Sequence, residues 1–268
     1  MTGTLAEAAC AVLGAADPGE KVRLTQEFAR AWRKAALAPG GEERPPARPA
    51  RPELPELRPP RDMKRRRAAG SREGRIALLH ALAHIELNAI DLAWDMVARF
   101  GGGAMPAAFH DDWIDVAAEE AKHFALLAAR LAALGASYGD LPAHDGLWEA
   151  AAATADDFLA RLAVVPLVLE ARGLDVTPAM IARLERAGDE ESAQVLRTIL
   201  ADEIGHVAAG VRWFRWECAR RGAEPEASYR AAVRSHFKGA LKPPFNIEAR
   251  GAAGLEPGFY EALAAGAC

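Results

Sequence analysis

The feature that most constrains this chain is a pair of Glu-x-x-His motifs, Glu120–His123 and Glu203–His206, each set in an apolar helical pattern. A further glutamate precedes each motif at nearly the same distance, Glu86 by 34 residues and Glu170 by 33. The repeat predicts two similar helical hairpins. One glutamate from each of two helices, with Glu-x-x-His from each of two others, is a ligand set by which four-helix bundles hold a pair of metal ions.

The spacing within each motif places both polar side chains on one helix face, because residues three apart are neighbours there. Four glutamates in a bundle core are costly unless cations compensate their charge. Mixed carboxylate and imidazole ligands suit iron or manganese better than magnesium, and the lack of thiolates argues against structural zinc. A single motif of this kind is usually a solvated pair, whereas six such residues in apolar surroundings favour a metal site. The predicted ligands are Glu86, Glu120, His123, Glu170, Glu203 and His206.

Composition favours an all-α protein of one large or two small domains. By the hydrophobic classes, 51% of the 268 residues are apolar, alanine and leucine are abundant, and β-branched runs are few. The net charge of −4 provides no global field for nucleic acid or a membrane surface. Charged residues interrupt the apolar stretches before they reach the roughly 18 residues that a membrane span needs.

The N-terminus and the cysteines favour a cytoplasmic protein. Residues 1–14 lack the basic start of a signal peptide. Cys10, Cys218 and Cys268 show neither metal-binding nor redox spacing, so we expect them to be reduced and structural or incidental.

Proline and glycine divide the chain into four expected segments. The stretch 39–70 contains so many prolines that it cannot form a helix. We expect it to be an arm packed over the bundle, anchored by Leu54 and Leu57, with a mobile linker as the alternative. The four segments are an N-terminal helical segment (1–38, with a break near 17–19), a Pro/Arg-rich arm (39–70), a di-metal four-helix bundle (71–222) and a C-terminal extension packing on the bundle (223–268).

Capping residues predict the first hairpin of this bundle. We expect one helix over 72–100, opened by Ser71 as its N-cap, and a second over 106–134. Glu86 and Glu120 each lie 14 residues from the helix end that the turn joins. An antiparallel hairpin with a constant rise per residue therefore brings the two carboxylates to the same height.

The second half of the bundle is less regular in sequence. A third helix is expected over 147–172, with a kink at Pro166 just before the ligand glutamate. The segment Gly173–Pro178 is expected to interrupt the helical pattern. The remaining expected elements are a short helix ending near Ala187, a fourth helix over 189–221 and a short helix over 225–240.

Several polar residues near the motifs have simpler interpretations. His80 and His84 lie away from the face of the first ligand glutamate, so we interpret them as satisfied histidines of the helix or an interface. The duplication selects Glu120 rather than Glu119, and Asp202 stays a candidate for holding a ligand imidazole. We expect His144 and Asp145 to shape or cap a turn. We expect Trp213 and Trp216 to pack in the core or at the bundle end, and the basic run Lys64–Arg67 to be solvated.

The phrase HIELNAIDLAWD, with the sequences around the other three glutamates, resembles the ferritin-like di-iron carboxylate superfamily. More closely, YGDLPAHDGLW, VLEARGLDVTP and DEIGHVAAGVRWF resemble phrases of an uncharacterised family of bacterial ferritin-like proteins, over roughly residues 45–250. The resemblance implies a ferritin-like four-helix core with a di-metal site at the six predicted ligands. It implies nothing about a substrate.

We expect a di-iron carboxylate oxidoreductase of the hydroxylase or oxygenase type, which activates dioxygen at two iron ions and acts on a small-molecule substrate. Manganese is the alternative metal at one or both positions. A separate reductase or ferredoxin would supply electrons. The tyrosines, Tyr138, Tyr229 and Tyr260, lie off the ligand helices, which disfavours a stable tyrosyl-radical generator.

Three alternatives stay open. An iron- or peroxide-handling protein is the first, although three scattered cysteines cannot build the four-cysteine iron domain usual in rubrerythrins, and the long arm makes a ferritin cage less natural. A tRNA-modifying hydroxylase is supported by the basic run alone, since nucleic acid is otherwise an unlikely partner. A non-enzymatic scaffold stabilised by metal is the third.

Overall fold

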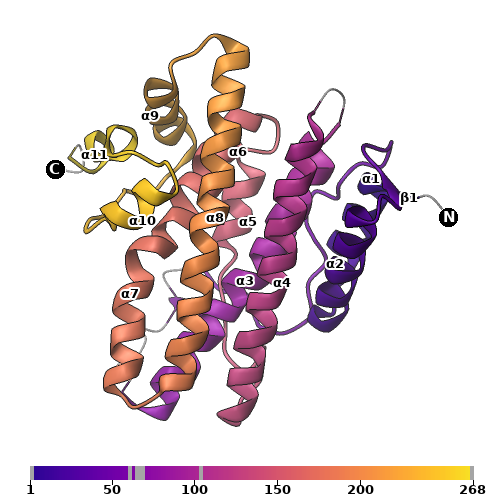
Figure 1. The fold of residues 1–268 in the computed structure, drawn as a ribbon. Helices are drawn as coiled ribbons and strands as arrows, with labels where there is room; N and C mark the ends of the chain where they lie inside the picture. Colours follow the sequence, from indigo (N-terminus) through magenta and orange to yellow (C-terminus); the bar gives the residue numbers. More distant parts are fainter. Residues whose placement is uncertain (1–2, 60–61, 64–69, 103–104, 266–268) are drawn as a thin grey trace. The chain divides into compact units, whose positions relative to one another are not determined.

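The computed structural model describes residues 3–59, 62–63, 70–102 and 105–265. Within these ranges the chain is mostly helical, with one pair of two-residue strands, so the all-α prediction is confirmed (Figure 1). The chain forms two compact units. The first comprises Met1–Trp148 and Arg183–Val195, and the second comprises Glu149–Ala182 and Leu196–Cys268.

The first unit is built on two long helices, α3 (Arg72–Phe100) and α4 (Ala107–Ala133), which pack against each other (Figure 1). The hydroxyl of Ser71 accepts a hydrogen bond from the N–H of Gly74 at 3.1 Å and so caps α3. After α4 the chain turns at Gly135, whose φ of +69° favours glycine. Both helices of the expected hairpin are therefore confirmed.

Two N-terminal helices cover this pair. Helix α1 (Leu5–Gly14) packs on α3, and α2 (Pro18–Arg33) packs on α4. The side chain of Thr4 caps the start of α1 and that of Asp17 caps α2. The break expected near residues 17–19 is thus confirmed, because the cap of the second helix lies there.

The described part of the arm is extended chain held by main-chain hydrogen bonds. No helix occurs within residues 39–59, as the prolines predict. The N–H of Ala50 donates to the carbonyl of Leu13 at 2.7 Å, and the N–H of Arg58 donates to the carbonyl of Ala143 at 2.8 Å. These bonds hold the arm against the rest of the first unit. The arm follows strand β2 (Leu37–Ala38), which pairs in parallel with β1 (Gly3–Thr4).

The expected anchors of the arm are wrong. The side chain of Leu54 is 61% exposed and that of Leu57 is 38% exposed, so neither fixes the arm by apolar burial. The side chain that does reach inward is Arg51, which pairs with Asp91 on α3. A buried ion pair between distant segments replaces the apolar contact, and the sequence of the arm itself gives no sign of it.

The helix expected over 147–172 is wrong in its first half. Helix α5 (Gly146–Ala152) ends early, and a turn over residues 153–157 separates it from α6 (Phe158–Val164). The carboxylate of Asp157 accepts hydrogen bonds from the first N–H groups of α6, at 3.0 Å and 3.4 Å. A good N-cap therefore restarts the helix here.

The interruption expected at Gly173–Pro178 is also wrong. A π-helical turn, η2 (Val165–Glu170), leads directly into α7 (Ala171–Arg186), which continues through both the glycine and the proline. A proline inside a helix deprives the carbonyl four residues earlier of its donor, here that of Leu174. The side-chain amide of Asn246 donates to this carbonyl at 3.1 Å and replaces the missing partner.

The remaining elements are helical, and they include the expected fourth helix. They are α8 (Glu190–Arg221), α9 (Pro225–His236), α10 (Ile247–Ala252) and α11 (Pro257–Ala265). The ring of Tyr229 on α9 packs against Phe214 and Phe259. Arg250 on α10 is buried and pairs with Asp175 of α7 at 2.7 Å. Aromatic packing and this ion pair hold the C-terminal helices in the second unit.

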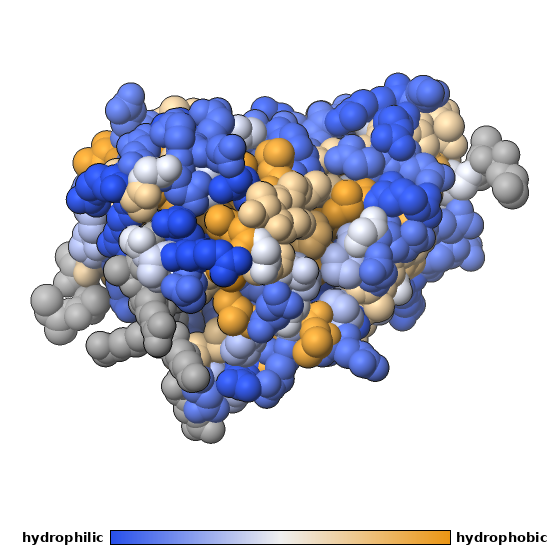
Figure 2. Space-filling view, turned by 90° about the horizontal axis from the view of Figure 1, so that it is seen from below, coloured by the Kyte–Doolittle hydropathy of each residue, from blue (hydrophilic) through white to orange (hydrophobic). Residues whose placement is uncertain are grey.

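Helix α3 is, within the part of the chain that the structure describes, long and apolar enough to cross a membrane. This differs from the expectation that no segment qualifies. In the most apolar stretch of α3, 78% is buried inside the protein, as in the core helix of a soluble protein, so the support for a span is weak. The face seen in Figure 2 is mostly hydrophilic, with smaller apolar areas.

Candidate metal centre

The first unit brings three of the predicted ligands together. Glu86 comes from α3, and Glu120 and His123 come from α4. The Nδ1 atom of His123 lies 3.2 Å from Oε2 of Glu120 and 3.4 Å from Oε2 of Glu86. All three side chains are buried, with exposed fractions of 3% or less. The prediction that the hairpin sets its carboxylates at one height is therefore confirmed for α3 and α4.

The charge on these carboxylates decides the protonation of the imidazole. Burial by itself lowers the pKa of His123, since a buried charge is costly, but hydrogen bonds and negative charge from Glu120 and Glu86 outweigh burial and raise it to about 10. In the absence of metal the histidine is therefore a cation at neutral pH, and it neutralises part of the negative charge in the helix pair.

The second unit carries the repeated motif. Glu203 and His206 lie on α8, and Nδ1 of His206 is 3.6 Å from Oε2 of Glu203. Both side chains are buried. Glu170 is the last residue of the π-helical turn η2 and is half-buried. Each Glu-x-x-His motif thus occupies one helix with its two polar groups on one face, as the spacing predicted.

A buried group of three predicted ligands in the first unit could hold a metal ion. The group consists of Glu86, Glu120 and His123. Carboxylates and an imidazole are hard and borderline donors, which suit iron or manganese. A site built from all six residues stays a prediction.

His80 and His84, six and two residues before Glu86 on α3, have other partners. Nε2 of His80 accepts main-chain N–H groups from Gly139 at 3.0 Å and Leu141 at 3.3 Å. His84 is hydrogen-bonded to the hydroxyl of Tyr138 at 2.8 Å. Both are satisfied histidines, which confirms their interpretation. The neighbours Glu119 and Asp202 are half-buried, whereas the adjacent predicted ligands are buried.

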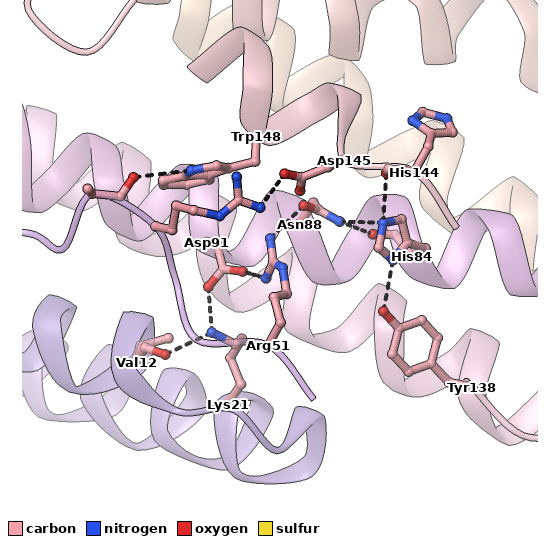
Figure 3. A network of polar contacts seen from close by, with 12 residues as sticks. Val12, Lys21, Arg51, His84, Asn88, Asp91, Tyr138, His144, Asp145 and Trp148 are labelled. Carbon is pink, nitrogen blue, oxygen red and sulfur yellow. Dashed lines mark hydrogen bonds and ion pairs between the residues drawn. The ribbon is translucent and has the colours of Figure 1, made fainter. Parts of the chain in front are cut away.

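A polar network that the sequence reasoning missed runs along α3 (Figure 3). Asp91 accepts a hydrogen bond from Nζ of Lys21 at 2.5 Å and also pairs with Arg51 of the arm. Arg51 donates to Oδ1 of Asn88 at 2.6 Å, and the amide of Asn88 donates to the carbonyl of His84 at 2.7 Å. The signal was present, because Asn88 and Asp91 are polar residues within an otherwise apolar stretch of helix.

The other residues singled out in the sequence have structural contacts. Nδ1 of His144 accepts the N–H of Gly146 at 3.2 Å, so this histidine shapes a turn as expected. Asp145 pairs with Arg48 of the arm, which the sequence did not predict (Figure 3). The rings of Trp213 and Trp216 pack edge to face. Cys10 and Cys218 are free, as expected, while Cys268 and the basic run Lys64–Arg67 lie outside the described residues.

Comparison with known proteins gives a family but no activity. An uncharacterized protein of Haemophilus influenzae is 42% identical over 199 residues, which cover 71% of this chain and 69% of the relative. No solved structure matches the chain. A family model described as protein of unknown function (DUF455) matches residues 14–261, which is nearly the whole chain. The chain therefore belongs to the DUF455 family.

Proposed function

We propose that this protein is a di-iron carboxylate oxidoreductase with a ferritin-like core, which activates dioxygen to oxidise a small organic substrate. Two metal ions would be held by the six predicted ligands. These are Glu86, Glu120, His123, Glu170, Glu203 and His206. In this proposal the four glutamates and the two histidines would hold the metals and leave positions open for dioxygen.

One observation carries the proposal. Glu86 and Glu120, from two helices, converge on the imidazole of His123 in a buried position. Burying two carboxylates beside one imidazole is unfavourable unless a cation compensates the charge. The same pair of residue types recurs on α8, with a further glutamate in η2. A protein that needed only a buried ion pair would have no reason to carry the pattern twice.

The donor set favours redox chemistry over a structural metal. Carboxylates and imidazoles without thiolates fit iron or manganese, and a bound iron pair supplies the electrons and open coordination positions for dioxygen. The protein's own side chains would bind and orient the metals. The negative charge of the carboxylates would offset the positive charge of the metals, and the burial of Glu120 and His123 excludes water. Electrons would come from a separate reductase or ferredoxin.

Anaerobic loading tests the proposal. Metal-free protein is mixed with ferrous iron without oxygen, the bound iron is counted, and Mössbauer spectra are recorded. Oxygen is then admitted while optical absorption and oxygen consumption are followed. We expect two irons per chain and stoichiometric oxygen consumption. Glu120→Ala and Glu203→Ala should abolish the dinuclear signal, whereas His80→Ala, which alters a satisfied histidine of the same hairpin, should retain it.

The other outcomes separate the alternatives. Uptake of many more than two irons per chain indicates iron storage. Two tightly bound irons that consume no oxygen indicate a scaffold that uses metal for stability. Failure to bind iron, manganese or cobalt under any loading condition overturns the proposal altogether.

A further inference from the structure

The glutamate in η2 differs from the other predicted ligands because a π-helical turn presents it. A π turn bonds each carbonyl to the N–H five residues later, so it holds one residue more than an α turn. Each residue of a helix advances the side-chain direction by about 100°. The turn Val165–Glu170 therefore directs Glu170 to a different side of the helix than a regular α-helix would. Single π turns are intrinsically rare and need support from their surroundings.

One support is a close approach of α8. A Cβ atom placed on Gly210 would lie 2.5 Å from Cβ and 2.8 Å from Cγ of Pro166. Carbon atoms do not approach so closely, so any side chain at this position would push η2 away from α8. Gly210 lies one helical turn after His206, and the contact therefore fixes the distance between the π turn and the helix that carries the second motif.

The second support is a hydrogen bond from α9. The hydroxyl of Tyr229 donates to the carbonyl of Leu167, in the middle of the π turn, at 3.1 Å. Tyr229 is fully buried, and the rings of Phe214 and Phe259 hold its side chain in place. Burial also raises the pKa of its phenol, so the hydroxyl keeps its proton and acts as a donor.

We infer that Gly210 and Tyr229 are positioning residues for the metal ligand Glu170. Gly210 lets η2 lie against α8, and Tyr229 donates a hydrogen bond to the carbonyl of Leu167 within the π turn. Neither residue is a predicted ligand, and both act on the same six-residue turn from different helices. The inference rests on the proposed function, since it assigns Glu170 to a metal.

Metal affinity of conservative variants tests this assignment. Tyr229→Phe removes one hydroxyl, and Gly210→Ala adds one methyl group. Cobalt(II) is titrated anaerobically into each metal-free variant, and bound metal is followed by its visible absorption, with circular dichroism as the check on folding. We expect each variant to lose about ten-fold in affinity for at least one cobalt ion, the size typical of residues that orient a ligand.

Two matched controls are available in the same unit. Tyr260→Phe removes a buried hydroxyl that has no hydrogen-bond partner within the described residues. Gly173→Ala adds a methyl group to α7, where a Cβ atom would meet nothing within 4 Å. Both controls should bind cobalt like the wild type.

A double variant separates positioning from general destabilisation. In a Glu170→Gln background, Tyr229→Phe should cause no further loss of affinity, because the ligand that it positions is already impaired. Wild-type affinity in both Tyr229→Phe and Gly210→Ala would overturn the inference while leaving the proposed function intact. If Gly210→Ala does not fold, Tyr229→Phe decides alone. A wild-type protein that binds no metal contradicts the proposed function itself.

Discussion

Nδ1 of His123 lies 3.4 Å from the carboxylate of Glu86, so the imidazole of one helix meets the acid of its antiparallel neighbour inside the protein. A proton on His123 and a metal ion are alternative cations for the same carboxylates. Burial lowers the pKa of His123, but hydrogen bonds and charge from the two acids outweigh burial and raise it to about 10, so the acids favour the protonated imidazole. A metal ion bound to His123, as proposed, would have to displace that proton.

Metal binding should stabilise the fold. We expect saturating manganese(II), at about 100 times its Kd, to raise the melting temperature by about 5 °C, since binding to the folded state alone adds about 2.7 kcal/mol. Glu86→Gln should remove most of this shift, because one carboxylate no longer carries charge. Glu119→Gln is the matched control, since Glu119 lies half-buried beside the proposed ligand Glu120. Differential scanning calorimetry with and without metal measures the shift, and an unchanged wild-type transition at millimolar metal contradicts the prediction.

Acid should destabilise the protein through His84. Burial lowers the pKa of His84 from 6.5 to about 4, although the carbonyl of His144 acts in the opposite direction. Nε2–H donates to that carbonyl and Nδ1 accepts the hydroxyl of Tyr138, so the fold needs the neutral ring. Between pH 6.5 and 4 the unfolded chain binds the proton and the folded chain does not, so stability falls as the pH falls through this window.

The pKa shift of His84 also sets the size of the expected stability loss and suggests a control variant. The loss amounts to about 3 kcal/mol at most between pH 7 and pH 4. His84→Gln keeps an amide that can donate to the carbonyl of His144 but cannot titrate. Urea unfolding at several pH values should show a weaker acid dependence in this variant than in the wild type. Equal slopes in the two proteins would mean that His84 does not govern this window.

Breaking the buried ion pair should be costly. Lys21 and Asp91 have fully buried side chains 2.5 Å apart, and Asp91 has a second cation in Arg51. We expect Lys21→Met to lower the free energy of unfolding by about 3 kcal/mol, because the carboxylate loses one of its two partners. Arg23→Ala on the same helix removes two exposed ion pairs, with Glu20 and Glu27, and should have no measurable effect. Urea unfolding at neutral pH compares them, and similar midpoints contradict the prediction.

Local sequence signals were sufficient for the first hairpin. The side chain of Ser71 caps the start of α3, and Gly135 adopts the left-handed backbone conformation just after α4 ends. Each residue acts within one turn of its helix end. The positions of Glu86 and Glu120 along their helices then follow from the constant rise per residue. For this reason the contact between Glu86 and His123 could be predicted from spacing alone.

The break between α5 and α6 has a local cause, the N-cap Asp157, but other errors come from the contribution of distant residues. The arm is fixed by the pairing of Arg51 with Asp91 rather than by its own leucines. The π turn before Glu170 depends on Tyr229 and on a glycine of another helix. Nothing in the sequence around Glu170 indicates these partners, so the orientation of this proposed ligand could not be predicted.

The continuation of α7 through Pro178 is explained by one such distant partner and gives the last prediction. The proline leaves the carbonyl of Leu174 without its helical donor, and the amide of Asn246 donates to it at 3.1 Å. Asn246→Ser keeps a side-chain acceptor able to cap α10 but loses this donor. It should lower the free energy of unfolding by about 1 to 2 kcal/mol. In a Pro178→Ala background the alanine N–H serves the carbonyl instead, so the same change should cost clearly less. Urea unfolding of the four proteins measures the coupling, and equal costs in both backgrounds would show that Asn246 does not compensate the proline.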